Sequence, residues 1–130
     1  MTDPITDMLN RIRNAQAVRH QTVEVPHSNL KQKLAEILVR EGFLDKIEKR
    51  RKKTQKIIEI YLKYSVDKSP VITGLKRISK PSQRIYKKSK EIRRIRGGYG
   101  IAIISTPQGL MTNKEARKKK TGGEILCEIW

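Results

Sequence analysis

Two apolar stripes at helical spacing, separated by a short β-forming run, constrain the fold of this chain more than any other feature. The first stripe follows Asp3-Pro4, a typical helix start. The second lies between Ser28, a favoured helix cap, and Gly42, a favoured helix stop. The run Thr22–Val25, which ends before Pro26, predicts a strand between the two helices. The apolar positions of the stripes are Ile5, Met8, Leu9, Ile12, Leu30, Leu34, Ile37 and Leu38.

Two further strands complete the pattern of the first half. We expect strands over Phe43–Lys49 and Ile57–Tyr64, the second with β-branched residues on both faces. A charged hairpin tip at Arg50–Lys53 joins them. This half therefore follows the order α-β-α-β-β, which is typical of a two-layer α+β unit.

A run of turn-forming residues divides the chain. The segment Val66–Pro70 (Val-Asp-Lys-Ser-Pro) is the expected linker, so we place the boundary near Asp67. Residues 1–66 should form the α+β domain, and residues 67–130 a mostly antiparallel β domain with short helices. Three strands are expected in this second domain, at Ile72–Ser79, Tyr99–Ile104 and Glu124–Trp130, with an extended piece at Arg84–Tyr86. A brief helix should run from Ser89 to Ile95 and end at Gly97-Gly98, and a tight loop should follow the buried second strand at Ser105–Gly109. A short helix should begin with a Thr112–Glu115 capping box and end at Gly122-Gly123.

The charge of the chain narrows the class of partner. The chain has 30 Lys and Arg against 13 Asp and Glu, and its formal net charge is +17. So many positive side chains on a compact protein repel one another, and binding of nucleic-acid phosphates would relieve that repulsion. Residues 1–66 hold 14 basic and 8 acidic side chains (net +6), whereas residues 67–130 hold 16 and 5 (net +11). We therefore expect the main nucleic-acid surface in the second half.

Membrane and secretory destinations are not indicated by the sequence. A membrane-surface protein would need a lipid anchor, a polybasic tail or a basic helix with large apolar residues, and aromatic residues make up only 5% of the chain. The start Met1-Thr2-Asp3-Pro4 lacks the pattern of a signal peptide, and no apolar run approaches a membrane span. A single cysteine, Cys127, fits a reducing compartment. We expect a cytoplasmic protein with no membrane partner.

Residues that could support catalysis or bind a metal are sparse. His20 and His27 lack Cys or acidic neighbours at metal-ligand spacing, so surface or capping roles are expected. Cys127 shares a predicted strand face with Ile125 and is expected to be a small core residue. The glycine-rich run Gly97–Gly100 leads from a helix into a strand, the reverse of a phosphate-binding loop. The sequence therefore predicts no enzyme, no metal and no cofactor.

Two basic clusters have competing interpretations. Arg50–Lys53 is either a solvated hairpin tip or a phosphate contact, and the sequence favours neither. Arg117–Lys120 ends a predicted helix, where cations interact favourably with the helix dipole. Four cations exceed what that role needs, which favours contact with RNA.

Two polar loops flank the predicted basic helix and carry the functional prediction. Ser105–Gly109 follows a buried strand, and Thr121–Glu124 precedes the closing strand. If these strands pair, the loops converge, and their hydroxyls and glycines allow close approach to a shallow RNA minor groove. Charge and one stacking ring would be added by Arg84, Tyr86, Lys87 and Lys88. On composition alone, ordinary turns remain an equal alternative.

Long motifs spread over the chain match one known family. They are Gly100–Arg117 (GIAIISTPQGLMTNKEAR), Gly122–Cys127 with Trp130, Leu75–Pro81, Arg84–Tyr86, Asp3–Ala15 and Arg40–Phe43. Together they closely resemble the small-subunit ribosomal protein S-eight family, bacterial type. The resemblance covers essentially the whole chain, and its C-terminal motif is long and specific.

The resemblance implies a structural role in the small ribosomal subunit. It implies early, direct binding to the central domain of 16S-type rRNA in assembly of the platform, with the Ser-Thr-x-x-Gly loop in a minor groove and a second rRNA contact from the N-terminal domain. Neighbours would be proteins S-five and S-two, and some members repress their own operon mRNA through a similar hairpin. The expected rRNA-binding residues are Ser105, Thr106, Gln108, Gly109, Gly122, Gly123, Glu124, Arg84, Tyr86, Lys88, Lys119, Arg13, Asn14, Ser28 and Lys31.

The chain departs from the family pattern at a few positions. Pro107 stands where Ser is usual, which removes a hydroxyl and an N–H that the loop would otherwise offer to RNA. Asn113 stands where Asp is common, and Glu128 where Tyr is common. The long C-terminal motif remains recognisable in spite of these changes.

Two other functions compete with a ribosomal role. A regulatory protein whose main target is mRNA would present the same surface, so the sequence does not separate the two. An enzyme acting on RNA would need a metal cluster, a nucleophile–base pair or a nucleotide loop. None of these is evident in the sequence.

Overall fold

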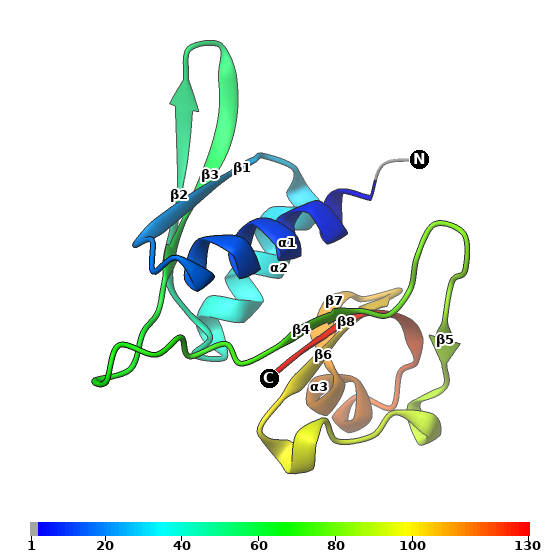
Figure 1. Ribbon diagram of the computed structural model, residues 1–130. Helices are drawn as coiled ribbons and strands as arrows, with labels where there is room; N and C mark the ends of the chain where they lie inside the picture. Colours follow the sequence, from blue (N-terminus) through cyan, green and yellow to red (C-terminus); the bar gives the residue numbers. More distant parts are fainter. Residues whose placement is uncertain (1–2) are drawn as a thin grey trace. The chain divides into compact units, whose positions relative to one another are not determined.

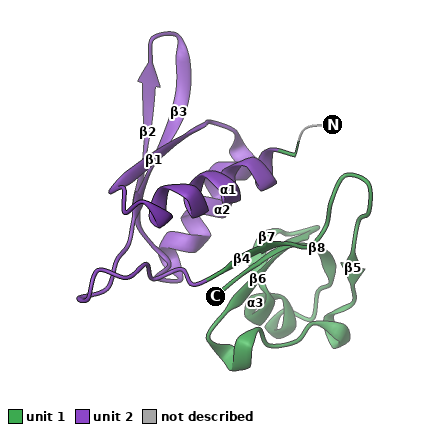
Figure 2. Cartoon of the chain, in the orientation of Figure 1, with its two compact units in different colours: residues 1–3, 74–130 green, residues 4–73 purple. Residues whose placement is uncertain are grey.

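The structure, a computed structural model, describes residues 3–130 (Figure 1). The chain divides into two compact units, an N-terminal unit of residues 4–73 and a C-terminal unit of Asp3 with residues 74–130 (Figure 2). Asp3 belongs to the C-terminal unit, where its Oδ2 lies 3.0 Å from Nε of the largely buried Arg77. No helix within residues 3–130 is long and apolar enough to cross a bilayer.

The boundary expected near Asp67 falls inside the N-terminal unit. The Asp67 carboxylate accepts a hydrogen bond from the Ser69 N–H at 3.0 Å and closes a turn. After this turn, the Val71 N–H donates to the Lys63 carbonyl at 3.0 Å. These bonds fold the predicted linker back onto the preceding segment, so the chain leaves the unit only after Thr73.

The N-terminal unit has the predicted α+β architecture. Helices α1 (Pro4–Ala17) and α2 (Asn29–Arg40) pack against an antiparallel sheet with the strand order β1-β3-β2 (Figure 1). The strands are β1 (Thr22–Pro26), β2 (Leu44–Lys52) and β3 (Gln55–Leu62). The core is formed by the predicted stripes and the inward side of the sheet, including Met8, Leu9, Ile12, Val25, Leu34, Leu38, Ile58 and Ile60.

Two details of this unit differ from the prediction. Leu30 is 40% exposed, because Lys31 takes the inward position in the first turn of α2 and donates from Nζ to the Pro26 carbonyl at 3.1 Å. Strand β2 continues through Arg50–Lys52, so the turn of the hairpin is shorter than predicted. Lys53, with φ of +60°, makes that turn.

The C-terminal unit is built around β8, which pairs with β4 and β5 on one edge and β6 on the other. All pairings are antiparallel, as predicted, and β7 extends the sheet beyond β6. The short helix α3 lies on one face of the sheet (Figure 1). The elements are β4 (Leu75–Arg77), β5 (Tyr86–Lys87), β6 (Ile101–Thr106), β7 (Gly109–Thr112), α3 (Asn113–Lys118) and β8 (Gly123–Ile129).

A bulge in β8 changes which residues share a face. Ile103 pairs with Cys127, and the next residue, Ile104, pairs with Ile125. Because neighbours on a strand point to opposite faces, Cys127 and Ile125 lie on opposite faces, contrary to the prediction. The expectation that Cys127 is a buried core residue is confirmed. Under α3, the core cluster comprises Ile92, Ala102, Ile104, Met111, Ala116 and Ile125.

The segment before β6 is less helical than predicted. Only a 3₁₀ turn, Ser89–Glu91, forms at its start, and Ile92 is extended. The Arg93 carbonyl accepts a hydrogen bond from Nδ2 of Asn113 at 3.0 Å, so a tertiary contact holds the extended segment. Strand β7 was not predicted, because four residues are too few to show a clear alternation.

Candidate nucleic-acid interface

Pairing of β6 with β8 brings the two polar loops together, as the sequence predicted. Ser105, near the end of β6, lies opposite Glu124, near the start of β8. A Cβ on Gly123 would stand 2.1 Å from the Ser105 carbonyl oxygen, so only glycine allows this approach. The turn after β6 and the loop before β8 therefore converge at one end of the sheet.

The turn between β6 and β7 is held by its own threonine. The Thr106 hydroxyl donates to the Gly109 carbonyl at 2.8 Å and accepts from the Gln108 N–H at 3.1 Å. Thr106 is buried, so its hydroxyl shapes the turn, and Pro107 and Gln108 form the exposed tip. Gly109 has a φ of +111°, which side-chain-bearing residues rarely adopt. Ser105 is half-buried, and its hydroxyl has no partner among residues 3–130.

Strand β5 places a second backbone beside the start of β8. Tyr86 pairs with Glu124, and Lys87 pairs with Gly123. A Cβ on Gly122 would lie 2.4 Å from the Lys87 carbonyl oxygen. The two glycines therefore allow close packing against β6 and β5. Their predicted role as a helix stop is wrong, because Lys120, which precedes them and has a positive φ, ends the helical turn.

Glu124 supports the interface through an ion pair. Its Oε2 accepts a hydrogen bond from Nη1 of Arg84 at 3.0 Å. Half of the Arg84 side chain is exposed, so the pair contributes little to stability, but it holds the guanidinium beside β5. Tyr86 is 68% exposed at the same edge, which leaves it accessible for stacking by a base.

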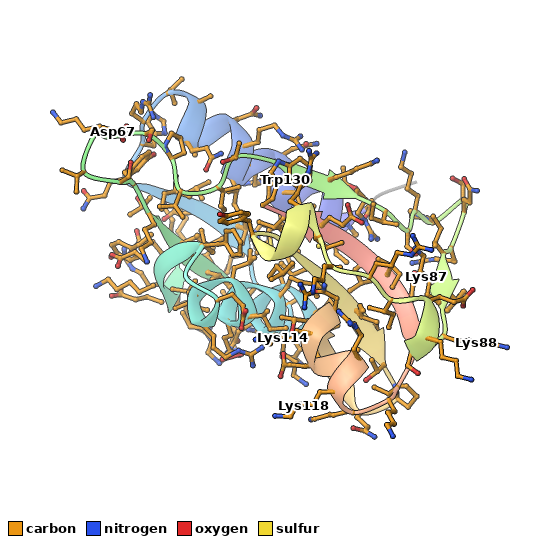
Figure 3. All side chains as sticks on the ribbon, turned by 90° about the horizontal axis from the view of Figure 1, so that it is seen from below. Asp67, Lys87, Lys88, Lys114, Lys118 and Trp130 are labelled. Atoms are coloured by element: carbon orange, nitrogen blue, oxygen red, sulfur yellow. The ribbon has the colours of Figure 1, made fainter. Side chains whose placement is uncertain are left out.

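A basic hollow of about 560 Å³ opens between β5 and the end of α3. Lys87, Lys88 and Lys120 line it, together with the two glycines of the preceding loop. Glu91 is its one acidic lining residue, and that carboxylate accepts the Lys88 N–H at 2.8 Å. The hollow therefore suits an anionic ligand. Lys88 extends outward from the C-terminal unit in Figure 3, where Lys87 is also labelled.

Helix α3 carries a run of cations at its C-terminal end. The predicted capping box is confirmed: the Thr112 hydroxyl accepts the Glu115 N–H at 3.2 Å, and Oε1 of Glu115 accepts the Thr112 N–H at 3.1 Å. Lys120, with φ of +54°, ends the helical turn. The cations Arg117, Lys118, Lys119 and Lys120 are exposed, and none has a carboxylate partner within residues 3–130. Lys118 is labelled in Figure 3.

The predicted residues of the N-terminal unit differ in accessibility. Arg13 and Asn14 are exposed on α1. The Ser28 hydroxyl accepts the Lys31 N–H at 3.2 Å and caps α2. Lys31 is only 7% exposed, and its ammonium is bonded to Pro26. Ser28 and Lys31 thus have structural contacts, and the accessible pair in this unit is Arg13 with Asn14.

His27 and Cys127 have the contacts of structural residues. Nε2 of His27 lies 2.8 Å from Oε1 of Gln32. Burial raises the pKa of the Cys127 thiol to about 12, so it is protonated at neutral pH. Within the described part of the chain, no cluster of His, Cys, Asp and Glu is arranged to hold a metal.

The sequence indicated the lysines of the hollow, but not that they line one hollow. Lys87 and Lys88 belong to the basic residues predicted beside the extended piece and Lys120 to the basic run Arg117–Lys120, whereas the lining does not include Lys119. The place of Lys87 depends on its pairing with Gly123, far along the chain. No local pattern reports a pairing between such distant segments.

Comparison with known proteins identifies the family of the chain. The family model described as "Ribosomal protein S8" matches residues 3–130. The chain belongs to the ribosomal protein S8 family. The predicted resemblance is thereby confirmed.

Curated relatives in the ribosomal protein S8 family match the chain over its full length. The small ribosomal subunit protein uS8 of Lysinibacillus sphaericus (strain C3-41) is 57% identical over 130 residues, which cover 100% of this chain and 98% of the relative. The proteins of the same name from Geobacillus kaustophilus (strain HTA426) and Exiguobacterium sibiricum are 55% and 54% identical, with the same coverage. The loops described above all lie inside these matches.

Proposed function

We propose that this chain is a structural protein of the small ribosomal subunit that binds small-subunit rRNA directly through its C-terminal unit. The observation that carries the proposal is the convergence of two close-approach loops, with Gly123 against Ser105, beside a set of exposed cations. Membership of the ribosomal protein S8 family supports the ribosomal context. The rRNA target would be a helix of the central domain, bound early as the platform assembles.

The residues of this interface divide into three roles. The Ser105 hydroxyl and the exposed tip at Gln108 reach 2′-hydroxyls and base edges in a shallow minor groove. Lys88 and Lys119 contact phosphates, which adds affinity without sequence preference. Thr106 does not need to contact RNA, because its hydroxyl holds the turn that presents the tip.

Further contacts extend the proposal. Arg13 and Asn14 are exposed on α1 and would give the N-terminal unit a secondary rRNA contact. In the assembled subunit the chain would adjoin proteins S-five and S-two. The same C-terminal surface would also bind a hairpin of the chain's own operon mRNA, if that hairpin copies the rRNA helix.

Two substitutions test the division of roles. Ser105→Ala should weaken binding to the specific rRNA helix by about 1–3 kcal/mol and leave random duplex binding unchanged. Lys119→Ala should weaken binding to both RNAs alike. It should also lower the slope of log affinity against log salt concentration by about 1. Lys114→Ala, at the opposite end of the same helix, is the matched control for charge (Figure 3).

Filter binding at several salt concentrations provides both readouts. Equal losses on specific and random RNA for Ser105→Ala would contradict groove recognition by the loop. Sedimentation of cell extract on a gradient separates the ribosomal role from a purely regulatory one. A chain missing from small-subunit fractions would overturn the structural role.

A further inference from the structure

One edge of β8 pairs with two separate segments of the chain. Strand β4 pairs with the end of β8, and strand β5 pairs with its start. Between them the chain leaves the sheet and makes the loop that connects β4 with β5 in Figure 1. The two residues that bound this loop, Ser79 and Ile85, both form backbone hydrogen bonds with Ile125 of β8.

Ile125 divides its two backbone hydrogen bonds between the ends of the loop. Its carbonyl accepts from the Ser79 N–H at 3.0 Å, and its N–H donates to the Ile85 carbonyl at 2.9 Å. In a regular antiparallel pair, a single residue would exchange both bonds with Ile125. The Ser79 N–H therefore stands where a regular ladder would place the Ile85 N–H.

The Ser79 hydroxyl supplies the acceptor that the Ile85 N–H lacks in the ladder. Its Oγ accepts a hydrogen bond from the Ile85 N–H at 2.7 Å and donates to the Ile85 carbonyl at 3.2 Å. A hydroxyl can make both bonds, because it has one proton to donate and lone pairs to accept. Ser79 is fully buried, so its removal would leave the Ile85 N–H without a ready substitute.

The rest of the loop is short and closed on itself. The backbones of Lys80 and Gln83 exchange two hydrogen bonds of 2.9 Å, and the two residues between them form a tight turn. The loop therefore has little slack between Ser79 and Ile85. The position of Ile85 in turn fixes where the chain enters β5.

Strand β5 depends on this attachment more than a longer strand would. It consists of two residues whose side chains are both exposed, so burial adds little to its pairing with β8. Ile85, the residue before it, is half-buried against the core cluster under α3. The two bonds from Ser79 hold Ile85 in that place, and β5 follows directly from it.

We propose that Ser79 is a positioning residue of the RNA interface, because its buried hydroxyl holds Ile85 and thereby sets the place of β5 beside the converging loops. This role rests on the proposed function, in which side chains on and next to β5 contact rRNA. Ser79 itself does not touch RNA, since protein encloses its side chain. Through Ile85 it places the exposed Tyr86 and two lysines of the basic hollow, Lys87 and Lys88.

Two alanine variants of matched chemistry separate positioning from stability. Ser79→Ala deprives the Ile85 N–H and carbonyl of their side-chain partner. Asn113→Ala likewise deprives the Ala102 N–H and the Arg93 carbonyl, near the start of β6, whereas β5 lies by its other end. Both variants should lose stability, but only Ser79→Ala should release β5.

Amide hydrogen exchange of the full chain without RNA tests the placement of β5. The amides of Lys87 and Lys88 should exchange about 3–10-fold faster in Ser79→Ala, as the loss of one hydrogen bond permits. The same amides should keep their rates in Asn113→Ala. Unchanged rates in Ser79→Ala would overturn the positioning role, because β5 would then hold its place without the hydroxyl.

Filter binding tests the consequence for RNA. The probe is a small-subunit rRNA transcript from Lysinibacillus sphaericus, the source of the relative that is 57% identical. Ser79→Ala should lower the slope of log affinity against log salt concentration by about 1–2, because lysines displaced with β5 no longer reach phosphates. Asn113→Ala should keep the slope, since all proteins are compared below their Tm.

A double-mutant cycle with Lys88→Ala gives a readout that a merely structural serine would not change. Lys88→Ala should lower the salt slope by about 1 in the unchanged protein and in the Asn113→Ala background. In the Ser79→Ala background it should have almost no further effect, because Lys88 is already displaced. Ser79→Cys fills the same space with a weaker hydrogen-bonding group and should show smaller shifts in the same direction; it replaces Ser79→Ala if that variant does not fold.

The outcomes separate the role of Ser79 from the proposed function. An unchanged salt slope in the folded Ser79 variants, or a full effect of Lys88→Ala in their background, would overturn the positioning role and leave the proposed function standing. Equal binding of the unchanged protein to the transcript and to random duplex RNA would remove the proposed function, and the role of Ser79 in RNA binding with it.

Discussion

Replacing Gly123 by alanine should open the junction between the two loops. The new Cβ would lie 2.1 Å from the Ser105 carbonyl oxygen, and ordinary contact begins at 3.4 Å. The two backbones must therefore separate by the difference, 1.3 Å, at a point where Ser105 pairs with Glu124. A shift of that size weakens the backbone hydrogen bonding there, and overpacking of this kind costs about 1–3 kcal/mol.

Thermal unfolding and RNA binding measure two different consequences of this change. The Tm of the C-terminal unit should fall by about 4–8 °C for each kcal/mol lost. Affinity for the specific rRNA helix should fall by about tenfold, or 1.4 kcal/mol, because the separated loops no longer fit one groove. Binding is measured well below the Tm, so that both proteins are folded.

Gly74→Ala is the matched control. Its Cβ would lie 2.3 Å from the Trp130 ring, at the end of β8 where Leu75 pairs with Ile129. This variant should lose stability but keep its RNA affinity. Equal losses of affinity in the two variants would refute the reasoning, since affinity would then follow the stability of the sheet and not the geometry of the loops.

Three further predictions concern stability and reactivity. The Arg50 guanidinium lowers the pKa of Glu59 in the folded chain, so the pair stabilises the N-terminal unit at pH values above the pKa of Glu59 in the unfolded chain. This stabilisation is lost as the pH falls from that unfolded pKa through the lowered folded pKa. Urea titrations at several pH values should show a smaller loss of stability on acidification in Arg50→Gln than in the unchanged protein. Asn113→Ala leaves the buried Ala102 N–H without its 3.1 Å acceptor and should cost about 1–3 kcal/mol in denaturant unfolding. The Cys127 thiol should react with a chromogenic disulfide reagent only after unfolding, and fast reaction of the native protein would contradict its burial.

Local patterns predicted those elements whose causes lie within one segment. The stripe from Ile5 to Ile12 forms a buried helix face because its spacing follows the helical period. The capping box of α3 forms because Thr112 and Glu115 satisfy each other's backbone N–H groups. Convergence of the polar loops was predictable because it required only that two apolar strands pair.

Other features depend on distant partners and had no local signal. Ser89 begins only a 3₁₀ turn, and the segment after it is held by a distant partner, because Nδ2 of Asn113 donates to the Arg93 carbonyl. The roles of Gly122 and Gly123 follow from close packing against β5 and β6, which no local sequence pattern predicts. The ion pair of Arg84 with Glu124 likewise joins segments whose neighbourhood is set by strand order.

The central place of β8 has a consequence for the timing of synthesis. This strand is made after β4, β5 and β6, yet each of them pairs with it. During synthesis, all residues of the N-terminal unit are therefore made early. In the second sheet, β4, β5 and β6 cannot complete their pairing until β8 has been made. A product truncated before Gly123 would contain every residue of the N-terminal unit but could not bring Gly123 against Ser105, so its two loops would not converge.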